Sequence, residues 1–240
     1  MNGLLSRVRL TYYYPVLFAL FLLVILNTQK ITMTGGPLTL FSVNSFLLAF
    51  YLGPILAGQK QRIDDLSRTV RAEAIALVNV TIHDRELNEA HRAEIRKLMR
   101  QYLSACAHAH QPGEGEREYE RLLAYCLEIE GKDEEKVKKV IETLIANQQN
   151  RGMISTLMRA AVYSHEWVVL MVLFSITISY IALIDYGGSM LLTLVAALLC
   201  AGLTLLFLIL QKLNSLSHKR AKQIWTPFDR MLATNLKQID

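Results

Sequence analysis

The chain has 240 residues, and 52% of them are hydrophobic, which is typical of a membrane protein rather than of a soluble domain. The formal net charge of +5 does not indicate nucleic-acid binding, because residues 60–162 balance 17 basic against 17 acidic side chains. The excess lies in the rest of the chain, where most basic residues flank apolar stretches and so indicate membrane topology.

The first apolar stretch, residues 10–26, is long enough for a tilted or partly exposed membrane helix. Arg7 and Arg9 precede it, as basic residues also precede the apolar part of a secretory signal. Residues 24–30, at the end of this stretch and just beyond it, contain no small-x-small cleavage pattern. We therefore favour a retained membrane helix over a cleaved signal.

The second apolar stretch, residues 31–59, contains 29 residues without a formal charge. At about 100° per residue, one face of this helix carries small polar groups and aromatic rings. The members of this face are Thr39, Ser42, Phe46, Ala49, Phe50 and Gly53. Lipid gives such a mixed face no advantage, so we expect it to meet a protein neighbour or to line a pore. The alternative is packing within the chain, with Ala49 and Gly53 allowing close approach of another helix.

Two further apolar stretches, residues 167–184 and 186–211, complete a set of four expected crossings. Asn44 lies on the opposite face of the second helix from the aromatic rings. We expect its amide to bind another helix of the same chain, with Ser175 and Ser179 of the third helix as partners.

Basic residues flank the ends of the expected crossings on one side of the membrane, and loops rich in Lys and Arg usually lie in the cytoplasm. The flanking basic residues are Arg7, Arg9, Lys60, Arg62, Lys212, Lys219, Arg220 and Lys222. The opposite loops carry only Lys30 and Asp185. Both termini and the central block are therefore expected in the cytoplasm.

The predicted fold is an all-α integral membrane protein with four transmembrane helices and a helical cytoplasmic insert between the second and third. The expected divisions are residues 1–59 for the first two crossings, 60–162 for the cytoplasmic block, 163–212 for the last two crossings and 213–240 for a cytoplasmic tail.

The central block shows apolar residues at helical spacing and no strand alternation. Residues 60–81 are expected to continue the second membrane helix into water, and a second helix is expected over 86–108. A third helix is expected to end at Gly131, and Asp133 is expected to cap a fourth. An amphipathic stretch after Asn150 is expected to lead into the third crossing.

No motif in the sequence indicates an enzyme, because HExxH, GxSxG and glycine-rich phosphate loops are all absent. His165 and Glu166 form the nearest candidate pair, and beside Trp167 they are more typical of a membrane-interface anchor. The pattern Cys106-x-His108-x-His110 is expected to face solvent rather than to bind a metal, and no cofactor is expected.

Below the second crossing, Arg62, Asp64 and Asp65 are close in the chain. A ring of copies of these residues would bias which ions enter a pore. They are therefore candidates for a cytoplasmic ion entrance.

The segment Ser45-Phe46-Leu47-Leu48-Ala49-Phe50-Tyr51 resembles the S-F-x-L-G-F-Y stretch that lines the neck of bestrophin channels. Residues 227–229, Pro-Phe-Asp, resemble the Pro-Phe-Gly turn of that family. The order of two crossings, a helical insert and two crossings is also similar. As a whole, the chain resembles the bacterial bestrophin-like family of membrane proteins.

The resemblance implies a homo-oligomer, a pentamer in bestrophins, whose second helices surround a pore in the bacterial inner membrane. Phe46 and Phe50 match the aromatic gate residues, so passive conduction of small inorganic ions is implied. The sign of the ion's charge is left open. Ala49 replaces the family glycine, and Pro54 is expected to kink the helix. The acidic calcium clasp of animal members is missing.

A second function remains open on the residues alone. The central block is long compared with the outer loops, so the chain could anchor a signalling or scaffold domain that binds a protein partner. The membrane helices would then serve only as an anchor.

Overall fold

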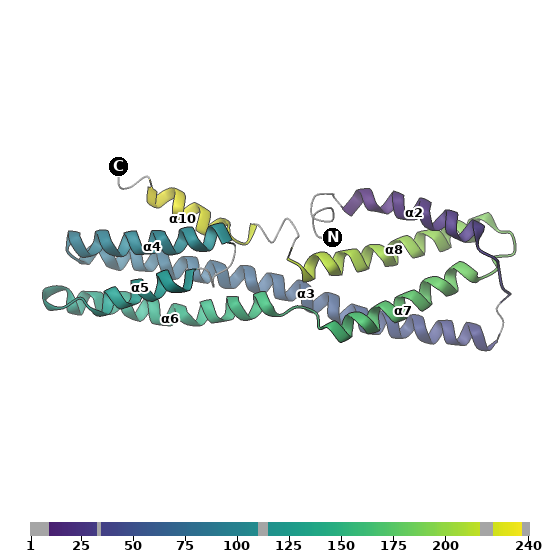
Figure 1. Cartoon of the computed structure of the whole chain (residues 1–240), viewed down its shortest axis with the longest axis horizontal. Coiled ribbons are helices and arrows are strands. Elements are labelled where there is room, and N and C mark those ends of the chain that lie inside the picture. Colours follow the sequence, from purple (N-terminus) through teal and green to yellow (C-terminus); the bar gives the residue numbers. More distant parts are fainter. Residues whose placement is uncertain (1–9, 33–34, 110–114, 217–222, 237–240) are drawn as a thin grey trace. The chain divides into compact units, whose positions relative to one another are not determined.

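The computed structural model describes residues 10–32, 35–109, 115–216 and 223–236 (Figure 1). Within these ranges the structure is all-helical apart from one isolated β-bridge, which confirms the predicted all-α class. The helices are α2 (Leu10–Asn27), α3 (Gly36–His83), α4 (Glu89–Ala109), α5 (Glu116–Leu127), α6 (Glu134–Arg159), α7 (Ser164–Leu183), α8 (Met190–Asn214) and α10 (Thr226–Leu236).

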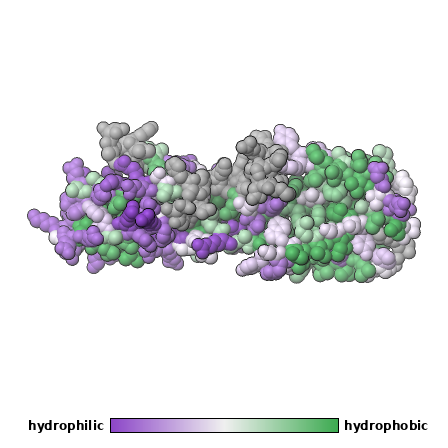
Figure 2. Space-filling model, viewed as in Figure 1, coloured by the Kyte–Doolittle hydropathy of each residue, from purple (hydrophilic) through white to green (hydrophobic). Residues whose placement is uncertain are grey.

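The chain divides into two compact units. The first, here called the apolar unit, comprises the described residues of 1–61 and 161–218, and the second, the polar unit, those of 62–160 and 219–240. Hydrophobic side chains gather on the apolar unit and hydrophilic ones on the polar unit (Figure 2).

Among the described residues, three helical segments each contain an 18-residue stretch that is apolar enough for a membrane crossing. They are Gly36–Glu86, Gly131–Leu183 and Met190–Asn214. Helix α2 is apolar but shorter, and it packs mainly on α8. The first apolar stretch thus differs from the others in the structure as it does in the sequence.

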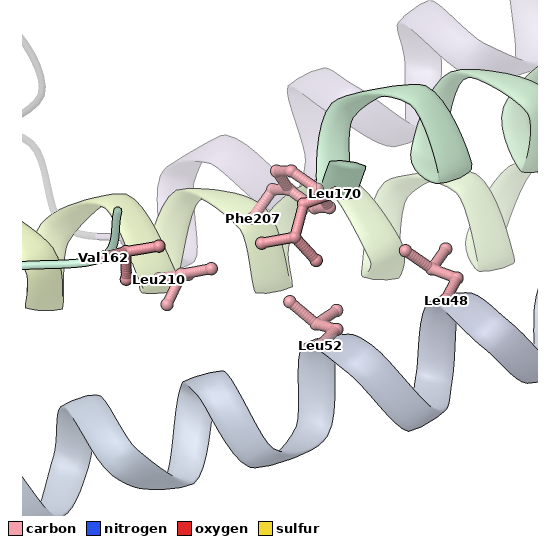
Figure 3. Close-up of a cluster of buried hydrophobic side chains, with 6 residues drawn as sticks. All are labelled: Leu48, Leu52, Val162, Leu170, Phe207 and Leu210. Atoms are coloured by element: carbon pink, nitrogen blue, oxygen red, sulfur yellow. The ribbon is translucent and has the colours of Figure 1, made fainter. Parts of the chain in front are cut away.

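Two clusters of buried side chains hold the apolar unit together. One joins α3 to α7 and α8 (Figure 3), and it consists of Leu48, Leu52, Val162, Leu170, Phe207 and Leu210. The other joins α2 to α7 and α8 through Ile25, Ile181, Ala196, Ala197 and Cys200. Small residues on α8 in the second cluster let neighbouring backbones approach closely.

The connections at one end of this unit are tied together by backbone hydrogen bonds. The Ile31 N–H donates to the Leu183 carbonyl at 2.8 Å, and the Asp185 N–H donates to the Ile31 carbonyl at 3.2 Å. The Lys30 Nζ also donates to the Ala182 carbonyl at 2.9 Å. These bonds link the segment after α2 to the C-terminal end of α7 and to Asp185.

In the polar unit, α3 continues as far as His83, which confirms the predicted extension of the second helix into the charged region. The helix runs through Gly53 and Pro54 without interruption. A short 3₁₀ turn, Asp84–Glu86, then ends it, so α4 begins at Glu89 instead of the predicted residue 86.

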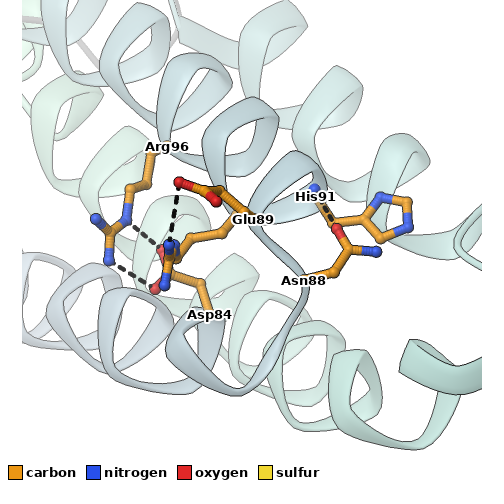
Figure 4. A network of polar contacts seen from close by, with 6 residues as sticks. Asp84, Asn88, Glu89, His91 and Arg96 are labelled. Carbon is orange, nitrogen blue, oxygen red and sulfur yellow. Dashed lines mark hydrogen bonds and ion pairs between the residues drawn. The ribbon is translucent and has the colours of Figure 1, made fainter. Parts of the chain in front are cut away.

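The start of α4 is fixed by two polar contacts (Figure 4). Asn88 Oδ1 accepts a hydrogen bond from the His91 N–H at 2.9 Å, as an N-cap residue does. Arg96 donates two hydrogen bonds to the fully buried Asp84 carboxylate, from Nε at 2.8 Å and from Nη2 at 3.0 Å. This paired geometry orients the guanidinium as well as neutralising the buried charge.

One predicted boundary role was wrong, and a second is confirmed in position only. Helix α5 ends at Leu127, and Gly131 starts a separate 3₁₀ turn with φ +84° instead of closing α5. Asp133 occupies the N-cap position of α6, but its carboxylate makes no side-chain cap there. It accepts the Asn88 N–H at 3.0 Å, and this bond is the main reason that the pKa of Asp133 lies below its ordinary value.

The amphipathic stretch after Asn150 belongs to α6 and leads to the third crossing through a short connection. Helix α6 ends at Arg159, and α7 begins at Ser164 after an extended Tyr163. Glu166 accepts the Tyr163 N–H through Oε2 at 3.0 Å, so this carboxylate stabilises the first turn of α7.

Residues 227–229, expected to form a turn, lie in the first turn of α10. Pro227 suits this place, because a residue in the first turn needs no N–H for an intrahelical bond. The Phe228 N–H donates to the Trp225 carbonyl at 3.0 Å, and the Phe228 ring is fully buried.

Candidate functional site: an uncovered face of α3

Helix α3 has a packed face and an uncovered face in the apolar unit. Leu48 and Leu52 are buried against α7 and α8, and Asn44 is buried on the same side. Phe46 and Phe50 lie on roughly the opposite side of the helix at about 100° per residue. The same contacts that bury the first face therefore leave the second one open.

The two aromatic rings on the open face lie against each other. Phe46 and Phe50 are each 67% exposed, and their ring centroids are 6.0 Å apart with planes 19° from parallel. This offset stacking is a favourable arrangement for two rings one helical turn apart. Neither ring is buried within the chain, so the structure disagrees with the alternative of intrachain packing.

The other four predicted members of this face are exposed as well. Thr39 Oγ1 donates to the Gly35 carbonyl at 3.3 Å, and Ser42 Oγ donates to the Leu38 carbonyl at 3.0 Å. Because these hydroxyls donate to their own helix, their oxygen atoms remain acceptors on the exposed side. The six residues therefore form one exposed face of α3, which carries two aromatic rings and two hydroxyl oxygens.

The remaining members, Ala49 and Gly53, are small and leave room beside the helix. No heavy atom lies within 4 Å of the position that a Cβ would take on Gly53. Both residues border an apolar groove of about 340 Å³ that α3 forms with α8 residues such as Leu199 and Leu203. Ser45 Oγ is buried at this groove and has no hydrogen-bond partner among the described residues.

Asn44 ties the packed face of α3 to α7. Its Nδ2 donates to Thr177 Oγ1 at 2.8 Å and to the Leu173 carbonyl at 3.1 Å. The predicted partner helix is therefore confirmed, but the predicted partners Ser175 and Ser179 were wrong. Both of these serines are exposed, and Thr177 lies between them in the sequence.

Replacing the Asn44 amide should weaken the apolar unit. We expect Asn44→Ala to lower the free energy of unfolding by about 0.6 to 2 kcal/mol, the range for hydrogen bonds between membrane helices. Thermal unfolding of the purified protein in detergent measures this change. Ser175→Ala is the matched control on α7, and an equal loss there would contradict the assignment of Thr177 as the partner.

The three candidate residues for an ion entrance have different environments. Arg62 is buried, and its Nε and Nη2 donate to the carbonyls of Leu157 and Met158 at 2.7 and 3.1 Å. This guanidinium satisfies the C-terminal end of α6, where a positive charge is favourable. Its prediction as an entrance residue is therefore corrected. Asp64 is exposed and Asp65 is half-buried.

Within the described part of the chain, no group of three histidine, cysteine or acidic side chains is placed to hold a metal. The side chains of His108 and His110 lie outside the described residues. Burial raises the pKa of the Cys106 and Cys126 thiols to about 12 each. These thiols are therefore protonated at neutral pH, which makes them poor nucleophiles and poor metal ligands.

The long apolar helices and the all-helical fold define an integral membrane protein. The Bestrophin-like domain model matches residues 36–224, which include the open face of α3 and most of the polar unit. The chain belongs to the bestrophin-like family, as its resemblance in α3 implied. No curated protein matches it in sequence.

A solved structure supports the fold. It is the crystal structure of a membrane protein with a TM-score of 0.71 and 12% sequence identity, covering 96% of this chain and 99% of the other. At this identity the likeness concerns the arrangement of the helices and not the activity.

Proposed function

We propose that the protein is a homo-oligomeric ion channel, in which α3 of each copy faces a common axis. Phe46 and Phe50 form a hydrophobic neck, and small inorganic ions pass through it without an energy source. A narrow apolar constriction controls ions by expelling water. Membership of the bestrophin-like family supports this function, and the family resemblance suggests a pentamer.

The observation that carries the proposal is the composition of the open face. Two stacked rings with 67% exposure could also face lipid, because phenyl groups are apolar. The hydroxyl oxygens of Thr39 and Ser42 on the same face gain nothing from lipid. A water-filled axis suits both kinds of group, since an ion that sheds water at the rings can be met by these oxygens.

The proposed topology has four crossings, formed by α2, the N-terminal part of α3, α7 and α8. Both termini and the block of residues 60–162 would lie in the cytoplasm of a bacterial cell, with the crossings in its inner membrane. The distribution of basic residues supports this orientation. Asp64 and Asp65 remain candidates for the cytoplasmic entrance.

Flux through liposomes that contain the purified protein tests the proposal. We expect wild-type protein to pass small ions and the double variant Phe46→Ala, Phe50→Ala to pass them several-fold faster, because the neck becomes wider and wetter. The control is Leu40→Ala, Leu47→Ala, which removes two exposed apolar side chains from another side of α3. This control should leave the flux unchanged.

Flux at the level of empty vesicles in the wild type and in the neck variant would reject conduction. The mass of the detergent-solubilised assembly provides an independent test, because a monomer has no axial pore. If the protein is monomeric and the polar unit captures a protein partner, the alternative scaffold function is favoured.

A further inference from the structure

A buried polar cluster in the polar unit has no part in the proposed neck. Glu73 of α3 is fully buried, and the Tyr102 hydroxyl of α4 donates a hydrogen bond to its Oε1. Arg151 of α6 lies over the Tyr119 ring, with Cζ 3.8 Å from the ring centroid. The Arg151 Nη2 also donates to Glu116 Oε2 at 2.6 Å. The Glu73 carboxyl group thus lies among side chains of three other helices.

The cluster satisfies Glu73 only in part. Its Oε2 has no hydrogen-bond partner among the described residues, and neither does the buried Nε of Arg151. An ionised carboxylate needs several hydrogen-bond donors when it is removed from water, whereas a neutral carboxyl group needs fewer. The surroundings of Glu73 therefore favour the protonated form.

Burial raises the pKa of Glu73 from an ordinary value of 4.5 to about 7. The hydrogen bond from Tyr102, the charge of Arg151 and the nearby amide of Asn147 lower this pKa, and the charge of Glu116 raises it. Burial outweighs the other contributions.

The neighbouring tyrosines and Cys106 keep their protons at neutral pH. Burial raises the pKa of Tyr119 and of Cys106 to about 12, and that of Tyr102 well above its ordinary value. Arg151 keeps its positive charge, and the Glu116 side chain is 59% exposed. Among the described members of the cluster, Glu73 is therefore the one whose charge changes near neutral pH.

We propose that Glu73 is a proton-dependent latch of the polar unit. The protonated carboxyl group keeps α3 closely packed on α4 and α6, and ionisation draws water to Oε2 and loosens this packing. Ionisation releases one proton to solvent and breaks no covalent bond. The effect on conduction rests on the proposed function, since α3 also carries Phe46 and Phe50.

The direction of the pH effect follows from the raised pKa. Between about pH 4.5 and pH 7 the folded state binds the Glu73 proton and the opened state does not, so stability falls as pH rises. Above about pH 7 both states are ionised at this residue, and the dependence levels off. The opening equilibrium should increase on the order of 100-fold across this range.

Hydrogen exchange of the full-length protein from about pH 5 to 9 tests the latch. Protection of the backbone amides around Glu73 in α3, corrected for the intrinsic exchange rate, should fall with pH and level off near pH 7. Glu73→Gln should abolish this dependence, because Gln keeps the shape and does not titrate. The matched control, Glu142→Gln, changes an exposed carboxylate on α6 and should retain the dependence. Dependence that persists in Glu73→Gln overturns the proposal.

A second variant tests the assignment without removing the carboxyl group. Tyr102→Phe deletes a hydrogen bond that lowers the pKa of Glu73, so the pH at which protection levels off should rise. A merely structural role of Tyr102 would lower protection at every pH without moving this point. If Tyr102→Phe leaves the pH at which protection levels off unchanged, the latch is overturned, even if Glu73→Gln does not fold.

Liposome flux separates this inference from the proposed function. If conduction changes with pH in the wild type and not in Glu73→Gln, the latch controls the neck. If exchange behaves as expected but no sample conducts, the latch stands and the channel function fails. If the wild type conducts and neither flux nor exchange changes with pH, the latch fails and the channel function stands.

Discussion

Arg151→Met should lower the free energy of unfolding of the polar unit by about 2 to 4 kcal/mol, the combined loss of a hydrogen bond between charged groups and of a cation–π contact. Methionine replaces most of the packing volume over Tyr102 and Tyr119, but it supplies neither the positive charge nor the bond to Glu116. The loss should be larger at about pH 8.5 than at about pH 6, because Glu73 is then ionised without a nearby cation.

Urea unfolding in detergent, followed by the fluorescence of the buried Trp225, measures this loss in the polar unit. A Trp167→Phe background removes the other tryptophan signal, since the chain has two tryptophans. Arg121→Met is the control, because Arg121 is exposed on α5 and its replacement should change stability by less than about 0.5 kcal/mol. Equal losses in both variants would contradict the role given to Arg151.

Gly115→Ala should destabilise the polar unit by about 1 to 3 kcal/mol through overpacking. A Cβ on Gly115 would lie 2.6 Å from the Cys106 Sγ and 2.7 Å from a ring carbon of Tyr102. The φ angle of Gly115 is −95°, so an alanine meets no backbone strain here and the cost comes from the contact with α4. The same urea titration measures the change.

The matched substitution in α6 should have the opposite sign. No heavy atom lies within 4 Å of a Cβ placed on Gly152, and this residue is exposed within the helix. Gly152→Ala should therefore stabilise the protein by about 0.5 to 1 kcal/mol, because alanine loses less conformational freedom in a helix. Destabilisation by both alanines would show that the α4 contact is not the cause.

Local patterns in the sequence were enough to predict the helices, but not the polar contacts between them. The uncharged run 31–59 and the apolar spacing that follows it predicted one continuous helix, and α3 has these properties. Helical periodicity also predicted that Asn44 would face another helix. It could not choose Thr177 over Ser175 or Ser179, because that choice depends on how α7 is rotated about its own axis.

The Glu73 cluster was missed, although one signal was present. Glu73 follows Leu66 and Val70 and precedes Leu77 at the spacing of a buried helical stripe, and all three neighbours are buried. A carboxylate at such a position indicates either an ion pair or a shifted pKa. Its partners come from α4, α5 and α6, and only the tertiary structure brings those helices to it.

Arg62 illustrates the opposite error. Its position beside Asp64 and Asp65 suggested a shared role, because the three residues are close in the chain. In a helix, however, side chains two positions apart point in very different directions. Arg62 lies on the packed side of α3 and binds the end of α6, whereas Asp64 lies on the exposed side.

The hydrogen bond between Asn44 and Thr177 also sets the phase of α3, that is, which residues it turns outward. Inserting one residue between Asn44 and Phe46 would rotate the rest of α3 by about 100° about the helix axis. Other side chains would then occupy the open face in place of the two rings. Inserting four would rotate the same part of α3 by only about 40°, close to the original orientation. The chain can therefore vary in length at this point only in steps near a whole helical turn.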